Sequence, residues 1–236
     1  MVIVVITSSS KTHGAMPYKM PDHEAFELLK KYEIPFPPYG VAKDPEEAGE
    51  IAESIGYPVV IKIISPSISH KTDVGGVILN LYNKKSVIES SRIMLENITK
   101  RLPGIEITGL LIQKMVPKGV EVIIGGINDP TFGGVVMFGL GGIFTEILRD
   151  VSFKITPLSI EDAVDMITEI RASNIIKGYR NLPPVDIMSI ADIIVKVSKI
   201  LDENPDIESI DLNPVIAYSD HALVVDARFI IHKQTS

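Results

Sequence analysis

Residues 64–76 are Ile-Ser-Pro-Ser-Ile-Ser-His-Lys-Thr-Asp-Val-Gly-Gly, a polar stretch with one histidine, His70, near its middle. The runs on either side, residues 59–64 and 77–81, are apolar, rich in β-branched side chains and bounded by turn residues, so we predict that both are strands. Pro66 removes a backbone donor and disfavours helix. The stretch is therefore predicted to be a loop that joins two strands and carries His70.

The chemistry of this loop depends on its histidine. A neutral imidazole can accept a phosphoryl group and pass it on, which makes His70 a candidate covalent relay. Gly75 and Gly76 allow backbone angles that are closed to other residues, so we expect the loop to be mobile at that end. A lone loop histidine is more often simply solvated, and only the motifs further along the chain favour the relay.

Composition limits the classes of protein to consider. The chain has 236 residues, 45% of them hydrophobic, no cysteine and a formal net charge of −7. These values predict a compact protein without disulfides or Cys-ligated zinc, and they argue against nucleic-acid binding. The apolar run at residues 1–6 is too short for a membrane span and has no basic segment before it, so we expect a cytoplasmic protein.

Residues 21–116 are predicted to form a first α+β lobe. A helical apolar spacing begins at Asp22, and a second helix has Asp44 and Glu47 at its start and Gly56 at its end. The strands around the His70 loop follow, then a helix near residues 85–101 and a strand at residues 110–115. Residues 1–20 show no periodicity, although residues 1–6 could be an edge strand, and we treat them as an extension of unknown role.

Residues 117–236 are predicted to form a second lobe with glycine-punctuated strands. We expect strands at residues 120–127, 134–139, 207–212 and 222–231, and helices at residues 159–170 and 186–201. Gly141 and Gly142 lead from a strand into a helix at residues 143–149, where free backbone amides could hold an anion. Glycines also serve in tight turns, and this segment alone does not separate the two roles.

Lys62 lies inside the apolar strand at residues 59–64. A buried charge is costly unless its end reaches a partner, so the flanking isoleucines favour a phosphate partner for this lysine. On an alternating edge strand, Lys62 could instead be exposed without any role.

A second polar group is Asp211, Asn213 and Asp226. Asp211 and Asn213 point to the same face of a strand, and a neighbouring strand that ends near Asp226 could bring three oxygen ligands together. Such ligands suit a hard cation, and Mg²⁺ in particular bridges phosphates while keeping some of its waters. The alternative is a strand end with ordinary turn chemistry.

The ordered set of motifs resembles the ATP-grasp nucleotide-binding subunits, and most closely the small β subunit of ADP-forming acetyl-CoA synthetases, which are related to succinyl-CoA synthetase. The resemblance covers about residues 21–232, and no single motif carries it. The matching stretches are residues 24–29, 58–62, 69–76, 113–126, 139–146, 211–215 and 226–228.

The resemblance implies an α+β ATP-grasp fold of two lobes with the nucleotide, ATP or ADP, between them. In that family the first-lobe lysine binds phosphates, which is Lys62 here. The hinge segment that holds adenine and ribose falls on Gln113, Lys114, Met115 and Val116, with Glu121.

The resemblance also implies the metal and catalytic residues. The Mg²⁺ ligands are Asp211, Asn213 and Asp226, and because the succinyl enzymes have Glu at the first position, the shorter Asp211 is expected to act through a water. The second phosphohistidine of the acetyl-type enzymes falls on His70. The glycine-led helix that faces the phosphohistidine corresponds to Gly141 and Gly142, with Glu146 as a histidine partner.

This resemblance predicts half of an enzyme, an acid–thiol ligase of the type acetate–CoA ligase (ADP-forming). The chain has no GxGxxG opening of a CoA-binding domain, so we expect a separate α subunit that carries CoA and the first phosphohistidine, in an α2β2 assembly. The overall reaction would convert acyl-CoA, ADP and phosphate to acid, CoA and ATP. The acid itself is left undetermined.

Two alternatives share part of this pattern. An ATP-grasp carboxylate–amine ligase uses the same lysine and Mg²⁺ ligands but makes an acyl phosphate directly and needs no loop histidine. A non-catalytic nucleotide-binding scaffold subunit would keep the fold without needing an intact metal set, and here the whole set is present. Both alternatives rank below the synthetase.

Overall fold

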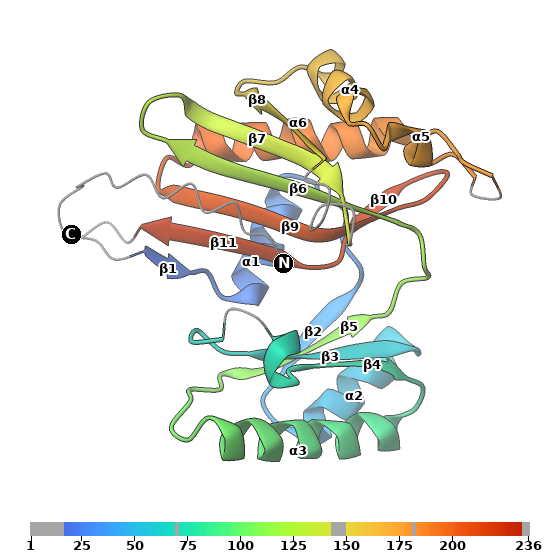
Figure 1. Ribbon diagram of the computed structural model, residues 1–236. Coiled ribbons are helices and arrows are strands. Elements are labelled where there is room, and N and C mark those ends of the chain that lie inside the picture. The colour runs from blue at the N-terminus through green and yellow to red at the C-terminus, as the bar shows by residue number, and fades with distance from the viewer. Residues whose placement is uncertain (1–16, 69–70, 143–149, 181–182, 233–236) are drawn as a thin grey trace. The chain divides into compact units, whose positions relative to one another are not determined.

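The computed structural model describes residues 17–68, 71–142, 150–180 and 183–232, which form two compact units (Figure 1). The smaller unit contains Lys19–Phe26 and Pro37–Pro117, and the larger unit takes its described residues from Met1–Tyr18, Glu27–Phe36 and Lys118–Ser236. Among the described residues, no helix has the length and apolar character needed to span a membrane.

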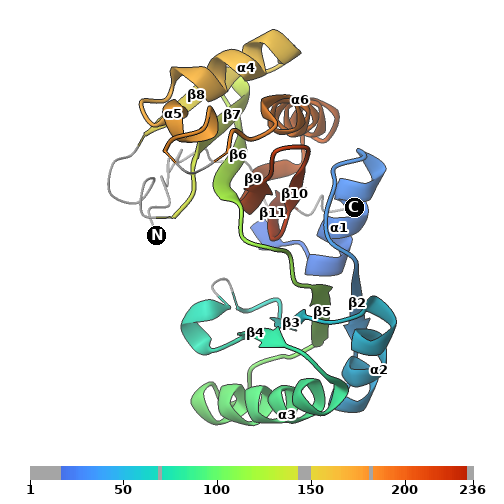
Figure 2. The same ribbon diagram turned by 90° about the vertical axis from the view of Figure 1, so that its right-hand side faces the viewer.

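The smaller unit is a four-stranded antiparallel sheet in the order β2-β5-β3-β4. Helices α2 and α3 lie together on one side of this sheet (Figure 2). Strand β3 is hydrogen-bonded on both sides, so Lys62 does not lie on an edge strand. The elements are β2 (Tyr39–Ala42), α2 (Pro45–Ile55), β3 (Val59–Ile64), η1 (Thr72–Val74), β4 (Val77–Leu81), α3 (Lys84–Arg101) and β5 (Gly109–Lys114).

The start and end of α2 follow the sequence signals. The Asp44 carboxylate accepts the backbone N–H of Glu47 at 2.8 Å, which satisfies one of the free amides of the first turn. The Glu47 carboxylate accepts the N–H of Lys43 at 2.7 Å, one residue earlier than in a standard capping box. Gly56 has φ 81° and donates its N–H to Ala52, so the predicted glycine end is confirmed.

The apolar core of the smaller unit lies between the sheet and its two helices. Successive strand residues face opposite sides, so Val59, Ile61 and Ile63 belong to this core and Val60 and Lys62 face away from it. The rest of this core comes from the helices and from neighbouring strands, with Ala48, Ala52, Val87, Met94, Ile98, Leu110 and Ile112 among its members.

The larger unit is a seven-stranded sheet in the order β1-β11-β9-β6-β7-β8, with β10 beside β9. Helix α6 packs against β6 and β7, and α4 packs against β8 and α6 (Figures 1 and 2). The strands are β1 (Pro17–Lys19), β6 (Val120–Asp129), β7 (Gly133–Leu140), β8 (Val151–Ile155), β9 (Ile207–Ala217), β10 (Ala222–Val224) and β11 (Ala227–His232). The helices are α4 (Ile160–Glu169), α5 (Ser173–Ile176) and α6 (Ile187–Glu203), and α1 (Asp22–Lys31) begins in the smaller unit and ends in the larger one.

The end of the chain differs from the sequence expectation in two ways. Strand β9 continues past Leu212 to Ala217, because Val215–Ala217 pair with β10. The strand expected at residues 222–231 is two strands, β10 and β11, that both pair with β9. Strand β1 was not predicted either, because its partner, β11, lies at the other end of the sequence.

Candidate functional site

Lys62 lies in the middle of β3 and is only 5% exposed. In the sheet register Lys62 is opposite Leu111, and Val60 is opposite Gln113. Directly opposite residues of an antiparallel pair share a face, so Lys62 and Gln113 lie on the face turned away from α2 and α3. A buried ammonium is stabilised by groups of opposite charge, and nucleotide phosphates are one such group.

Gln113, on the same face, has a buried amide group that is suited to bind a ligand. Its side chain is 1% exposed, and its Nε2 has no hydrogen-bond partner in the part of the chain that the structure describes. A buried amide donor left unsatisfied costs about 1–3 kcal/mol. A ligand acceptor that reached this amide, such as a ribose or base oxygen, would offset that cost.

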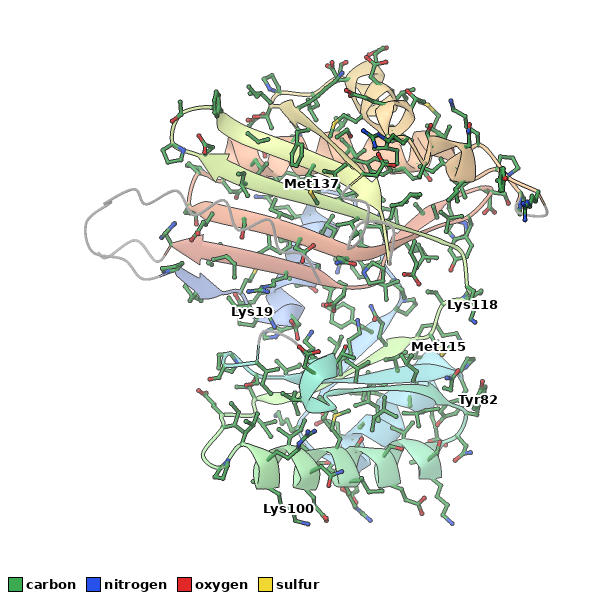
Figure 3. The ribbon with its side chains drawn as sticks, viewed as in Figure 1. Lys19, Tyr82, Lys100, Met115, Lys118 and Met137 are labelled. Atoms are coloured by element: carbon green, nitrogen blue, oxygen red, sulfur yellow. The ribbon has the colours of Figure 1, made fainter. Side chains whose placement is uncertain are left out.

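The next two residues of the predicted hinge have structural partners. The Lys114 Nζ donates to the carbonyl oxygens of Gly56 at 3.1 Å and Tyr57 at 2.7 Å. The N–H of Met115, labelled in Figure 3, donates to the carbonyl of Pro58 at 3.0 Å. These bonds close the turn between α2 and β3, so a nucleotide held here would meet the backbone of this segment rather than the Lys114 side chain. Val116 follows directly and is half-buried.

In the larger unit the structure brings Glu121, Gly141 and Gly142 together. The N–H of Gly141 donates to the carbonyl of Glu121 at 2.7 Å, and a Cβ added at Gly141 would lie 2.8 Å from the Glu121 Cβ. Gly142 has φ 67°, and the Glu121 carboxylate lies 3.9 Å from the position of an added Cβ. A carboxylate accepts ribose hydroxyls readily, and this favours Glu121 as a ribose ligand.

The backbones of the three predicted metal ligands lie close together. The N–H of Asn213 donates to the carbonyl of Asp226 at 3.1 Å, and Asp211 lies two residues before Asn213 on β9. Asp211 and Asn213 are exposed and Asp226 is half-buried. Within the described ranges, no three His, Cys, Asp or Glu residues could hold a metal by themselves, so the site depends on the Asn213 amide oxygen beside two carboxylates. Such hard oxygen donors fit Mg²⁺.

Arg228 is a candidate site residue that the sequence reasoning missed. It lies directly across from Asp211 in the pairing of β11 with β9. Its Nε is buried and has no hydrogen-bond partner among the described residues. A guanidinium beside a cluster of carboxylates is well suited to hold a phosphate. Its position across from Asp211 follows from the register between β11 and β9, so no local signal in the sequence identifies it.

The ATP-grasp domain model matches residues 15–231 of this chain. The chain belongs to the ATP-grasp family. Its curated relatives include the subunit beta of acetate–CoA ligase [ADP-forming] I from Pyrococcus furiosus, 50% identical over 208 residues, which are 88% of this chain and 90% of that protein. Acetate–CoA ligase [ADP-forming] I from Archaeoglobus fulgidus is 43% identical over 211 residues, 89% of this chain but 31% of that longer protein. The chain is thus an ATP-grasp protein of the ADP-forming acetate–CoA ligase β-subunit type, and a β subunit implies a partner subunit.

Solved structures of an acetyl-coenzyme A synthetase 1 from Ca. Korarchaeum cryptofilum confirm the mixed α/β ATP-grasp fold. One, with coenzyme A, Ca-AMPCP and HgCl+, has a TM-score of 0.89 and 46% identity and covers 91% of this chain and 93% of its own. A second has a phosphorylated phosphohistidine segment, with a TM-score of 0.85, 45% identity and coverage of 92% and 94%. A third binds coenzyme A and Mg-AMPPCP, with that segment pointing towards the nucleotide site, a TM-score of 0.80, 44% identity and coverage of 91% and 93%.

Two predicted residues of this ATP-grasp chain, His70 and Glu146, lie outside the described residues, as does the expected helix at residues 143–149. The glycines after His70 are described, and Gly75 has φ 76°, a left-handed backbone angle that favours glycine. The N–H of Gly76 donates to the carbonyl of Lys71 at 2.7 Å, and a Cβ on Gly76 would lie 2.5 Å from the Ile63 Cγ2. Gly76 is therefore needed for close packing of the turn against β3.

Proposed function

We propose that this chain is the nucleotide-binding subunit of an enzyme that makes ATP from acyl-CoA, ADP and phosphate, and that it passes the phosphoryl group through His70. The observation that carries the proposal is the 50% identity over 88% of the chain to a subunit beta of an ADP-forming acetate–CoA ligase. The relay is supported by the related structures in which a phosphohistidine segment is phosphorylated or points towards the nucleotide.

The proposed step at this chain is a single transfer. The P–N bond between the phosphoryl group and the His70 imidazole breaks, and a P–O bond forms to a terminal β-phosphate oxygen of ADP. The imidazole leaves as a neutral base once it holds one proton, and ATP is the product. Because little covalent chemistry is left to the protein in phosphoryl transfer, its work is to position the groups and to balance charge.

The described residues suit that work. Lys62 and Arg228 bring positive charge to the phosphates, and Gln113 and Glu121 offer a donor and an acceptor for the nucleoside. Asp211, Asn213 and Asp226 would hold Mg²⁺, which when bound neutralises negative charge on the phosphates. Glu146, Gly141 and Gly142 are proposed to act near the histidine.

We further propose a separate α subunit that binds CoA, the organic acid and a first phosphohistidine, in an α2β2 assembly. Support comes from the Archaeoglobus fulgidus relative, in which the matching region is 31% of one longer chain. Purification from the native source tests this directly. A stoichiometric CoA-binding partner is expected, and a chain that is active alone would contradict the proposal.

The relay is tested by incubating the complex with labelled ATP and locating acid-labile, base-stable phosphoryl groups by subunit. We expect label on this chain in the wild type and none in His70→Ala, which should also lose acyl-CoA-driven ATP synthesis. His221→Ala is the matched control, because His221 is an exposed histidine between β9 and β10. Full ATP synthesis by His70→Ala, with no label on the wild-type chain, would show that His70 is an ordinary loop residue.

A further inference from the structure

Asp22 is a buried carboxylate held between two lysines. Its Oδ2 lies 2.9 Å from the Nζ of Lys71, and its Oδ1 lies 3.1 Å from the Nζ of Lys19. The three side chains are 3%, 8% and 9% exposed. Figure 3 labels Lys19, which ends β1 shortly before α1 begins. A buried ion pair of this kind is tolerated only while both partners are present.

Lys71 directly follows His70 in the sequence. Its side chain is bound to Asp22, and its carbonyl accepts the N–H of Gly76 at 2.7 Å. The N–H of Gly75 in turn donates to Thr72 at 3.1 Å, which closes the short turn η1. Lys71 is therefore held both through its ammonium and through its backbone.

The residues before His70 are held as well, by burial. Ile68 is 4% exposed and belongs to the apolar core of the smaller unit, and Ser65 is 3% exposed. A cavity of about 240 Å³ is lined by Asp22 together with Ser65 and Pro66, so Asp22 lies where both ends of the histidine segment meet. We define this segment as residues 65–71.

We propose that Asp22 is a positioning residue for phosphoryl transfer, acting through its ion pair with Lys71 to fix the residue next to His70. The inference rests on the proposed relay through His70. Without the Asp22 carboxylate the buried Lys71 ammonium loses an anionic partner at 2.9 Å, which weakens the hold of the smaller unit on the residue next to His70. Asp22 thereby sets how much of the time His70 is presented for transfer.

A simpler role for Asp22 is structural. It is an acidic residue in the first turn of α1, where a negative charge is favourable, and it also pairs with Lys19. Lys19 supplies the control that separates the two roles, because Lys19→Met removes an ammonium from the same carboxylate and leaves the pair with Lys71 intact.

Amide hydrogen exchange of the full chain tests the anchoring. In Asp22→Asn and in Lys71→Met we expect exchange in peptides covering residues 66–76 to be at least about tenfold faster than in the wild type. In Lys19→Met and in Lys71→Arg we expect rates within about twofold of it. If Asp22→Asn and Lys71→Met exchange at the wild-type rate, or if Lys19→Met is as fast as Lys71→Met, the proposal is wrong.

Labelling of the same chains with labelled ATP and MgCl2 tests the positioning. In Asp22→Asn the labelling rate at saturating ATP should fall about tenfold while the half-saturating ATP concentration stays unchanged, and Lys71→Arg should keep the wild-type rate. An unchanged or faster rate in Asp22→Asn would overturn the positioning role. If exchange behaves as expected but the wild-type chain takes no label on His70, the relay has failed, the positioning role fails with it, and only the anchoring of the segment by Asp22 remains.

Discussion

The backbone N–H of Asn213 donates a 3.1 Å hydrogen bond to the carbonyl of Asp226. The two residues are therefore neighbours in the backbone, with Asn213 on β9 and Asp226 between β10 and β11. Asp211 is on the same strand as Asn213 and lies directly across from Arg228. The larger unit thus places Asp211, Asn213, Asp226 and Arg228 at neighbouring backbone positions, and side chains of these types suit a metal-bound nucleotide phosphate.

Removing a ligand from this set should abolish Mg²⁺-dependent nucleotide turnover. Asn213→Ala and Asp226→Ala each remove one oxygen donor, and we expect at least about tenfold weaker binding of Mg-ADP with the fold intact. Titration calorimetry with Mg-ADP measures the affinity, and circular dichroism checks the fold. Asp220→Ala, at a carboxylate that is 76% exposed, is the control. Wild-type affinity and turnover in both site variants would exclude the two residues from the site.

Lys62→Met should weaken nucleotide binding. A hydrogen bond to a charged group contributes about 1.5–3 kcal/mol, which corresponds to roughly 10- to 100-fold in affinity. Circular dichroism checks that the fold survives, because removing one partner of a buried ion pair destabilises a protein. Calorimetric binding of ADP, compared with the exposed control Lys100→Met on α3, provides the measurement. An unchanged affinity in Lys62→Met would place the Lys62 ammonium away from the nucleotide.

The local elements of this fold were predictable because their signals are local. Asp44 and Gly56 mark the two ends of α2, and the β-branched run that became β3 needs only its own residues to be recognised. The order of strands was not predictable in the same way. Strand β1 pairs with β11 from the other end of the chain, and residues 17–19 alone contain no signal that predicts this pairing.

The candidate site follows the same rule. Asp211 and Asn213 could be grouped because strand alternation puts them on one face. The position of Arg228 opposite Asp211 depends on the register between β11 and β9, which is a long-range property. The hydrogen bond from the Lys114 ammonium to the carbonyl of Gly56 is likewise a contact between residues far apart in the sequence, and no local pattern predicts it.

Gly141→Ala should destabilise the larger unit. An added Cβ would lie 2.8 Å from the Glu121 Cβ and 3.1 Å from the Glu121 backbone. Either β6 or the residues that follow β7 must therefore shift. Overpacking of this kind typically lowers the free energy of unfolding by about 1–3 kcal/mol. Urea unfolding of the variant and the wild type measures this loss. Gly125→Ala is the matched control on β6, because the nearest atom to its Cβ would be the flexible end of Met137 at 3.3 Å, and the nearest backbone atom, the Ile210 carbonyl oxygen, would lie at an ordinary 3.6 Å (Figure 3). Equal losses in both variants would mean that the contact with Glu121 does not matter.

The stability of the protein should depend on pH through Asp162 at the start of α4. Its carboxylate accepts hydrogen bonds from the Lys154 Nζ at 2.9 Å and from the N–H of Ser159 at 3.1 Å, and these contacts, Lys154 foremost, lower its pKa from 3.8 to about 2. A carboxyl whose pKa is depressed in the folded state adds stability above its unfolded pKa and loses it as the pH falls through the folded value. Wild-type protein should therefore be more stable than Asp162→Asn at neutral pH, and the difference should shrink between about pH 4 and pH 2. Urea unfolding of both proteins across this range measures the difference, and a gap that stays constant down to pH 2 would show that the ionised carboxylate contributes nothing.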